Sequence, residues 1–499
     1  MKKALAIVVI VALTLIMVFT FAACNKYKWD PVGTTEYLGE DAVGNGTLAV
    51  KQGKYLYFVN NVASVDSLTK EDNEWGANGT NGAIMKSVIK DDGSLECLGV
   101  VVPKIYTTSA STAGIYVYGE WIYYVARSQK TDNKGSLISA VEFLRTTTDG
   151  TKTESLATVE NVSADYIFTA TGLLYTNDSN IHYVDYTGKK PVDNEVVTEY
   201  TDVEFSKDDL CIFYTQANES DYVLGNHLGV VLSDGSVKTI IAENSYYSGE
   251  GDYRSNLSTL FTLDIIGYDA SENAIFYTKT CRDAEARVTT NGYALPADYS
   301  FVAADEKTYA NSALSSVYSL GVNNWIVNIA SSTLVAYAPM DDTIHEKKSD
   351  EISLTASITI LFNETFDDVV YTYYLMSSNL YRANLIKDNA LNKNAYEEKI
   401  SDVAFGTTYG KPNYLDGYLY YESSDDATYL SRIKISSYDA STQALINGYI
   451  VSGYKDYEYP EDADYVINKD DEVIKDKVPA YITDADLTTY ISNHKSDKE

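Results

Sequence analysis

The chain of 499 residues is poor in the residue types that interrupt strands or carry out chemistry. It contains eight prolines, four histidines and four cysteines, against 45 tyrosines. Many aromatic and β-branched residues with little proline suit a pleated, half-buried surface. The composition therefore predicts an all-β fold and argues against an all-helical one.

Motifs of the common catalytic and metal sites are also missing. The four histidines, His182, His227, His345 and His494, show no HExxH, HxH or Cys/His spacing for zinc. The chain has neither a Gly-rich phosphate loop nor a GxSxG turn. The sequence therefore predicts no catalytic, metal-ligating or cofactor-binding residue and no cofactor. A Ser-His-Asp triad, whose members need not be neighbours, stays open.

Cysteine usage indicates no disulfide framework. Besides Cys24, which belongs to the N-terminal segment discussed below, the chain has Cys97, Cys211 and Cys281. These three are an odd number and lie far apart. Cys211 is expected to pack as a small apolar side chain, and whether any two of the three form a disulfide stays open.

Positive charge is scarce, and the formal net charge is −32. Because recognition of phosphates needs a basic patch, the absence of a Lys/Arg cluster beyond the N-terminus argues against a nucleic-acid partner. It also argues against binding of anionic lipid by the domain surface. Acidic pairs such as Asp91-Asp92 and Asp341-Asp342 do not fit the twelve-residue calcium loop, so we interpret them as solvated loops.

The first 24 residues predict an export signal. Lys2 and Lys3 precede an uncharged, largely apolar run from Ala4 to Ala23. The residues Phe21-Ala22-Ala23-Cys24 resemble a lipobox, which implies a diacylglycerol thioether on Cys24 and cleavage before it. The alternative is an uncleaved transmembrane anchor, because about 20 apolar residues span a bilayer. Both alternatives place the rest of the chain at the cell membrane on its extracytoplasmic side.

A short phrase recurs seven times: a turn, an aliphatic residue, an aromatic residue and a β-rich run. The copies lie at 53–61, 119–126, 171–178, 209–216, 272–279, 367–374 and 416–423. The aliphatic column is Leu56, Ile122, Leu174, Ile212, Ile275, Val370 and Leu419; the aromatic column, expected to form the repeat core, is Tyr57, Tyr123, Tyr175, Phe213, Phe276, Tyr371 and Tyr420. The spacing approaches that of a four-stranded propeller blade with loops of varying length.

Tight turns such as Asp92-Gly93, Asp149-Gly150 and Asp234-Gly235 follow the phrase and predict hairpins in which glycine has a positive φ. Because one repeat cannot bury both faces of its strands, we expect the repeats to close into a ring. The prediction is a β-propeller of about seven four-stranded blades behind a lipoprotein signal peptide; a pair of β-sandwiches is the rival. The boundaries are 1–23 for the signal peptide, 24–46 for the tether, 47–454 for the propeller and 455–499 for an acidic tail. Residues 332–357 are either an insertion or a degenerate eighth blade.

The repeats resemble a known family. LLYTND followed by IHYVDYTG, GEWIYYVA followed by FLRTTTDG, and DGYLYYES followed by YLSRIKIS are similar to the YWTD-like propeller repeat of low-density-lipoprotein-receptor-related proteins. Arg145, Arg382 and Arg432 lie where that family has its arginine, whereas the tryptophan is absent and the aspartate survives only as Asp178. The chain more closely resembles bacterial lipoproteins of uncharacterised function with such a propeller. The resemblance spans residues 46–440 at the level of motifs.

These observations predict a membrane-anchored, extracytoplasmic propeller that acts as a binding or scaffold module for a protein or glycan partner and not as an enzyme. Long inter-strand loops at 62–82, 127–140, 243–260 and 280–312 are expected to form the binding face, because loops on a rigid scaffold usually carry recognition. The alternative is a propeller-type polysaccharide hydrolase or lyase, which needs a carboxylate pair in the central cavity.

Overall fold

The computed structural model describes Val32 and, with gaps, residues 41–446. The gaps of five residues or more are 65–82, 108–113, 128–132, 134–139, 248–256, 297–306, 310–316, 341–346, 402–411, 423–429 and 436–444. Cys24, the expected signal peptide 1–23 and the acidic tail 455–499 lie outside the described residues. Within them, every regular element is a β-strand, and no helix is long and apolar enough to cross a membrane.

Three four-stranded antiparallel sheets come first along the chain. The first sheet contains β1 (Ala49–Gln52), β2 (Tyr55–Asn60), β4 (Ala83–Ile89) and β5 (Leu95–Val102). The second contains β7 (Tyr116–Tyr118), β8 (Trp121–Arg127), β9 (Val141–Thr147) and β10 (Thr153–Val159). The third contains β11 (Tyr166–Phe168), β12 (Gly172–Asn177), β13 (Asn180–Asp185) and β14 (Val192–Val197). In addition, β3 (Ala63–Ser64) and β6 (Tyr106–Thr107) form a short parallel pair.

The fourth sheet has eight strands and is called the double sheet here. Its first half is β15 (Tyr200–Ser206), β16 (Leu210–Ser220), β17 (Val223–Val231) and β18 (Val237–Tyr247). Its second half is β19 (Leu257–Asp269), β20 (Ala274–Asp283), β21 (Val288–Pro296) and β22 (Lys307–Tyr309). The two halves are joined where the end of β18 pairs with the start of β19.

Three further sheets complete the described chain. The fifth contains β23 (Val317–Ser319), β24 (Ile326–Ala330), β25 (Thr333–Ala338), β26 (Lys347–Lys348) and β27 (Ile352–Ser353). The sixth contains β28 (Ile358–Phe366), β29 (Val369–Met376), β30 (Asn379–Lys387), β31 (Ala390–Leu391) and β32 (Glu397–Ser401). The seventh contains β33 (Asn413–Leu415), β34 (Tyr418–Glu422), β35 (Leu430–Lys434) and β36 (Leu445–Ile446).

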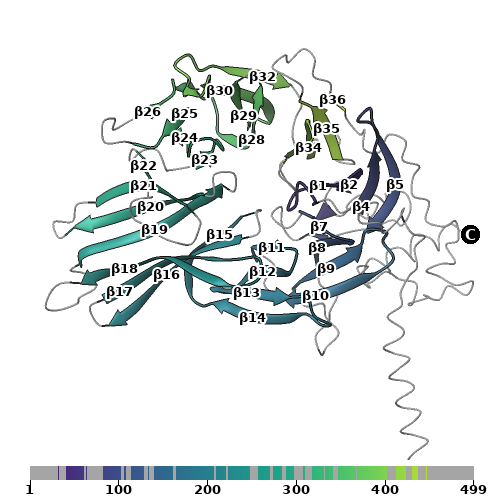
Figure 1. Ribbon diagram of the computed structural model, residues 1–499, viewed down its shortest axis with the longest axis horizontal. Coiled ribbons are helices and arrows are strands. Elements are labelled where there is room, and N and C mark those ends of the chain that lie inside the picture. Colours follow the sequence, from purple (N-terminus) through teal and green to yellow (C-terminus); the bar gives the residue numbers. More distant parts are fainter. Residues whose placement is uncertain are drawn as a thin grey trace, which may run out of the picture.

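The seven sheets follow one another around a ring in chain order, so that the seventh lies beside the first (Figure 1). This is the predicted all-β propeller, and the rival pair of sandwiches is not observed. The double sheet holds two four-stranded units, so the ring contains one unit more than the seven copies of the phrase. The additional unit is the fifth sheet, which includes much of the interval 332–357 and is therefore a degenerate blade and not an insertion. Its second strand, β24, has no aromatic residue, which explains why the phrase does not detect it.

The recurring phrase marks the second strand of a blade in all seven copies. Every residue of its aromatic column is at most 6% exposed, and every residue of its aliphatic column is equally buried. Because successive side chains of a strand point to opposite faces, one column packs toward each neighbouring blade. Both faces of the second strand are therefore buried between sheets, as radial packing requires.

The ring closes without a strand shared between its first and last sheets, within the described residues. The Asn413 side-chain amide donates a hydrogen bond to the Ala49 carbonyl oxygen over 3.1 Å, and Arg432 donates one to the Gly93 carbonyl oxygen over 2.9 Å. Lys51 and Asp416 form an ion pair across the same boundary. Leu415, Tyr420 and Leu430 also belong to the apolar cluster of the first sheet. Side-chain contacts therefore close the ring at this seam.

Candidate functional site

The two ends of the propeller differ in their connections. Neighbouring strands of a blade are antiparallel, so the connections from first to second strand and from third to fourth strand share one end, called the turn face here. The predicted hairpins lie at this end, and Gly93, Gly150 and Gly235 have φ of +77°, +76° and +79°. The connections from second to third strand and from the fourth strand to the next blade share the opposite end, called the connection face.

The connection face carries the long connections 61–82, 128–140, 248–256 and 402–412. Two of the loops expected to form a binding face, 62–82 and 127–140, belong to it, but most of their residues lie outside the described part of the chain.

The described residues of the other two expected loops, 243–260 and 280–312, are all in strands, so the prediction is wrong for these residues; the remaining residues of both loops lie outside the described part of the chain. β18 continues to Tyr247, β19 starts at Leu257, and β20 and β21 pair from Ala274–Pro296 at one end to Arg282–Val288 at the other. The segment Val288-Thr289-Thr290 is β-branched throughout, which favours a strand. The segment lacks the apolar alternation by which a half-buried strand is recognised in a sequence.

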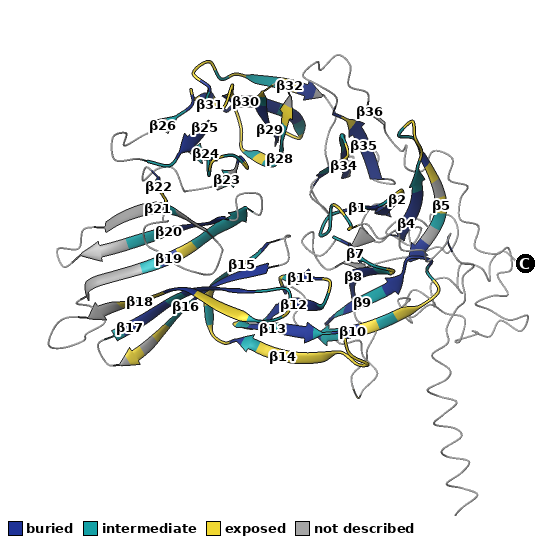
Figure 2. Ribbon diagram, viewed as in Figure 1, coloured by how far each residue is buried: buried dark blue, intermediate teal, exposed yellow. Residues whose placement is uncertain are grey.

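The double sheet therefore extends further than any other sheet. β16 to β21 have nine to thirteen residues each, and they project beyond the outline of the ring (Figure 1). The extended ends of β16, β18 and β20 point to the connection face, because each of these strands ends there. We call this six-stranded extension the wall. Parts of β16 and β18 in the wall are exposed (Figure 2), among them Ala217, Glu219 and Ala242.

A buried polar network holds the base of the wall together. The Tyr214 hydroxyl donates a 2.6 Å hydrogen bond to Asn226 Oδ1, and Gln216 Nε2 lies 2.9 Å from the Tyr214 oxygen and 2.8 Å from Asn226 Oδ1. Asn226 Nδ2 donates to the Leu224 and Glu243 carbonyl oxygens. Asn226 is fully buried. Because a buried amide is costly unless its hydrogen bonds are made, this network favours one fixed packing of β16, β17 and β18.

An ion pair joins the two halves of the double sheet. Lys279 Nζ on β20 lies 2.6 Å from Glu243 Oε2 on β18, across the intervening strand β19. Below it, the apolar side chains of both halves form one cluster, which includes Ile212, Leu228, Leu263 and Ile275. The wall is thus a rigid extension with an apolar base and polar ties.

A small cavity lies between two neighbouring blades of the described chain. Its volume is about 180 Å³, and Asp165, Tyr166, Val203 and Glu204 line it between the inner strands β11 and β15. Burial raises the pKa of Asp165. Ligand pockets usually enclose about 300–1,000 Å³, so this cavity offers little room for the polysaccharide that the hydrolase or lyase alternative requires.

The arginines singled out by the family resemblance have a shared structural position. Arg145, Arg382 and Arg432 lie on the third strand of their sheets, β9, β30 and β35. Their guanidinium groups lie 4.3 Å from the Trp121 ring, 4.5 Å from the Tyr371 ring and 4.1 Å from the Tyr418 ring, respectively. Such stacking is worth about 2 kcal/mol when desolvated. These contacts stabilise the blades.

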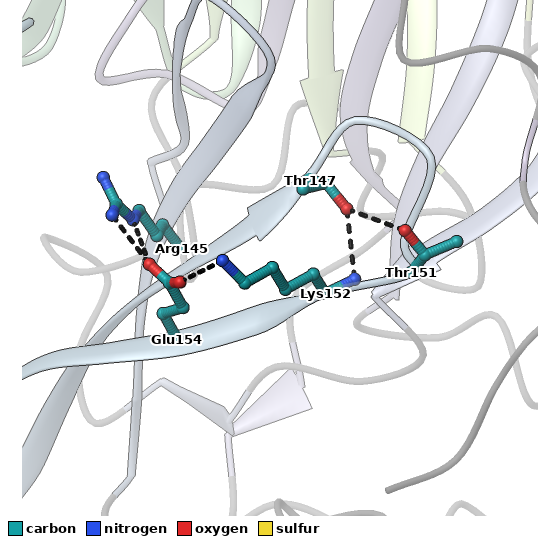
Figure 3. Close-up of polar contacts among 5 residues, drawn as sticks. All are labelled: Arg145, Thr147, Thr151, Lys152 and Glu154. Carbon is teal, nitrogen blue, oxygen red and sulfur yellow. Dashed lines mark hydrogen bonds and ion pairs between the residues drawn. The ribbon is translucent and has the colours of Figure 1, made fainter. Parts of the chain in front are cut away.

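The cluster around Arg145 shows how a charged group is accommodated there (Figure 3). Arg145 Nε and Nη2 lie 2.8 and 2.7 Å from Glu154 Oε2, and Lys152 pairs with the other oxygen of Glu154. Thr147 and Thr151 meet at the turn beside it over 3.4 Å. Partial burial acts to raise the pKa of Glu154, but the hydrogen bonds and charges of Lys152 and Arg145 outweigh it and lower this pKa.

Lys86 holds the corresponding place in the first sheet, and sequence reasoning missed it. It lies on the third strand, β4, is fully buried, and places Nζ 4.4 Å from the Tyr55 ring. Nζ also donates a 3.1 Å hydrogen bond to the Thr148 carbonyl oxygen of the second sheet. Burial lowers the pKa of Lys86 to about 8. An alignment of third strands that treated lysine and arginine alike would have found it.

Two of the histidines lie among the described residues. His182 Nδ1 lies 3.2 Å from Asp193 Oδ1, while the Tyr175 hydroxyl donates a 2.7 Å hydrogen bond to Asp193 Oδ2. These contacts tie β12, β13 and β14 together. His227 on β17 lies 3.8 Å from Glu219 on β16. His345 and His494 lie outside the described part of the chain.

Neither a metal cluster nor a disulfide is found among the described residues. No group of three His, Cys, Asp or Glu side chains there could hold a metal ion. Cys211 is a fully buried free thiol, and its burial raises the thiol pKa. The side chains of Cys97 and Cys281 are outside the description, so their pairing stays open.

The chain was compared with known families, curated proteins and solved structures. No family model matches the chain, and no curated protein matches it. Among solved structures, the β-propeller domain of the Trilobed protease from Pyrococcus furiosus is 8% identical, with a TM-score of 0.31 over 70% of this chain and 93% of that one. The Pyrococcus horikoshii acylaminoacyl peptidase is 10% identical, with a TM-score of 0.30 over 70% of this chain and 56% of that one. A functionally unknown protein from Desulfotomaculum acetoxidans is 12% identical, with a TM-score of 0.30 over 62% and 93%.

Proposed function

We propose that the chain is a lipid-anchored, extracytoplasmic β-propeller that binds a protein or glycan partner on its connection face and catalyses no reaction. The wall is the observation that carries this proposal. Six strands extend beyond the ring on the face that also collects the long connections, and a polar network with an interstrand ion pair fixes their arrangement. A rigid scaffold that displays connections is the usual construction of a recognition surface.

The anchor is a separate part of the proposal and rests on the lipobox-like residues before Cys24. A lipoprotein carries at least two acyl chains, which together hold a protein stably to a membrane. The full chain should partition into the detergent phase of a Triton X-114 extract. The Cys24→Ser variant should keep an uncleaved signal and lose the mass of the lipid. A wild-type chain whose mass equals that of the unmodified polypeptide, with or without residues 1–23, would refute lipidation.

The binding face can be tested with two matched substitutions. Ala242 on the wall and Ala170 on the turn face are both exposed alanines, so Ala242→Arg and Ala170→Arg introduce the same side chain on opposite faces. The soluble 25–499 fragment of each variant is immobilised, and proteins and glycans retained from an envelope extract are quantified by mass spectrometry. We expect Ala242→Arg to retain at least tenfold less partner than wild type, and Ala170→Arg to retain as much as wild type. Loss with Ala170→Arg alone would place the binding face at the opposite end.

A further inference from the structure

One residue of the tether is fixed on the propeller. The Val32 amide donates a 2.9 Å hydrogen bond to the Asp149 carbonyl oxygen, at the turn between β9 and β10. Its side chain is 7% exposed and belongs to the apolar cluster of the first sheet. The side chain lies against β5 at Gly99, where an added Cβ would be 3.6 Å from Val32 Cγ1. The chain is therefore attached at the boundary between the first and second sheets, on the outer strand.

The distance from this attachment to the lipidation site is short. Val32 follows Cys24 by only eight positions, and eight residues span at most about 28 Å when fully extended. A folded body of about 400 residues has a radius of gyration of about 21 Å and is therefore roughly 55 Å across. The tether thus reaches about half the width of the propeller.

The wall lies on the other side of the ring. Figure 1 shows β5 at the right edge of the molecule and β16 to β21 at the left edge, with the ring between them. The attachment at Val32 and the exposed residues of β18 are therefore separated by most of the width of the molecule.

From these observations we infer that the rim formed by β5 and the β9–β10 turn is the membrane-proximal side of the propeller, and that the wall is its membrane-distal side. The inference rests on the lipid anchor in the proposed function. The attached rim stays within the reach of the tether, whereas the wall is free to stand a full width further from the bilayer. The partner that this geometry fits is a macromolecule approaching from outside, and not a protein embedded in the same membrane.

The orientation is tested with the lipidated chain in vesicles that contain an acceptor-labelled lipid. A donor dye is coupled to a clickable amino acid placed at Leu98 on β5 or at Ala242 on β18, both of which are exposed. We expect energy transfer from position 98 to be at least twofold more efficient than from position 242. Equal efficiencies, or a higher one from position 242, would overturn the inference.

Two controls separate the causes of a negative result. Insertion of about twenty Gly/Ser residues after Asn25 gives a flexible linker and should bring the efficiency at position 98 down toward that at position 242; an unchanged difference would refute the role of the short tether. A chain that does not associate with vesicles refutes the proposed lipid anchor, whereas a chain that associates and shows equal transfer refutes only the orientation.

Discussion

The seam between the seventh and first sheets makes the sharpest prediction, through Arg432. This side chain is 2% exposed, stacks on Tyr418 at 4.1 Å, and donates hydrogen bonds to the Gly93 carbonyl oxygen at 2.9 Å and to the Tyr420 hydroxyl at 3.4 Å. Arg432→Met keeps most of the apolar stem and removes the cation. Because Gly93 belongs to the first sheet, the substitution weakens the contact that holds the ring closed.

The expected loss follows from the contacts removed. A hydrogen bond from a charged donor contributes about 1.5–3 kcal/mol, and a desolvated cation–π contact about 2 kcal/mol. Relief of the desolvation of a buried guanidinium offsets part of this sum. We expect a net loss of about 2–4 kcal/mol, which raises the equilibrium constant for opening about 30- to 1,000-fold.

Native-state hydrogen exchange reads this loss strand by strand. In Arg432→Met, the amides of β1 and of β33 to β35 should exchange faster together, while those of β16 and β17 keep their protection. The matched control is Arg382→Met, because Arg382 is 1% exposed in its side chain and pairs with Glu398 of its own sheet over 2.6 Å. Its effect should centre on β29 to β32. Unchanged protection of β1 in Arg432→Met would refute the assignment of this seam as a side-chain closure.

Further substitutions test three other features. Burial lowers the pKa of Lys86 from 10.5 to about 8, so between these pH values the unfolded chain binds more protons than the folded one. Raising the pH from about 7.5 to about 9.5 should therefore increase the unfolding free energy of wild type by about 2 kcal/mol more than that of Lys86→Met. Urea titrations at the two pH values measure this difference, and equal increases would contradict the lowered pKa. Gly235 has a φ of +79°, and a Cβ added there would lie 2.4 Å from Tyr183. Gly119 has a φ of +58°, and a Cβ added there would have no atom within 4 Å. Gly235→Ala should therefore lower the melting temperature clearly more than Gly119→Ala, which costs about 1 kcal/mol of stability. Asn226→Ala should lower the unfolding free energy by about 2–3 kcal/mol, because Tyr214 and Gln216 lose the buried amide that they contact. Lys279→Met should lower it by less than about 1 kcal/mol, because its ion pair is partly exposed. The reverse order in urea unfolding would show that the ion pair, and not the amide, fixes the wall.

The all-β propeller and the position of its second strands could be predicted from the sequence, because burial on both faces demands an aliphatic and an aromatic column. The fifth sheet could not be found this way, since β24 keeps an aliphatic residue, Val327, but buries Asn328 where other blades bury an aromatic residue. Reasoning from the sequence also failed at the wall. There the strands are stabilised by backbone pairing with one another and by polar contacts such as the Lys279–Glu243 ion pair. Neither kind of contact requires the alternating apolar residues by which a strand is recognised in a sequence.

The seam also constrains the order in which the protein can be made. Asn413 and Ala49, which meet across it, are 364 residues apart in the chain. The first blade is therefore synthesised long before the seventh, and its flank with Ala49 and Lys51 lacks its final neighbour until then. Contacts between such distant segments form slowly, since the intervening chain must first be ordered. A chain arrested before its seventh blade should expose that flank to proteases and holdase chaperones until synthesis resumes.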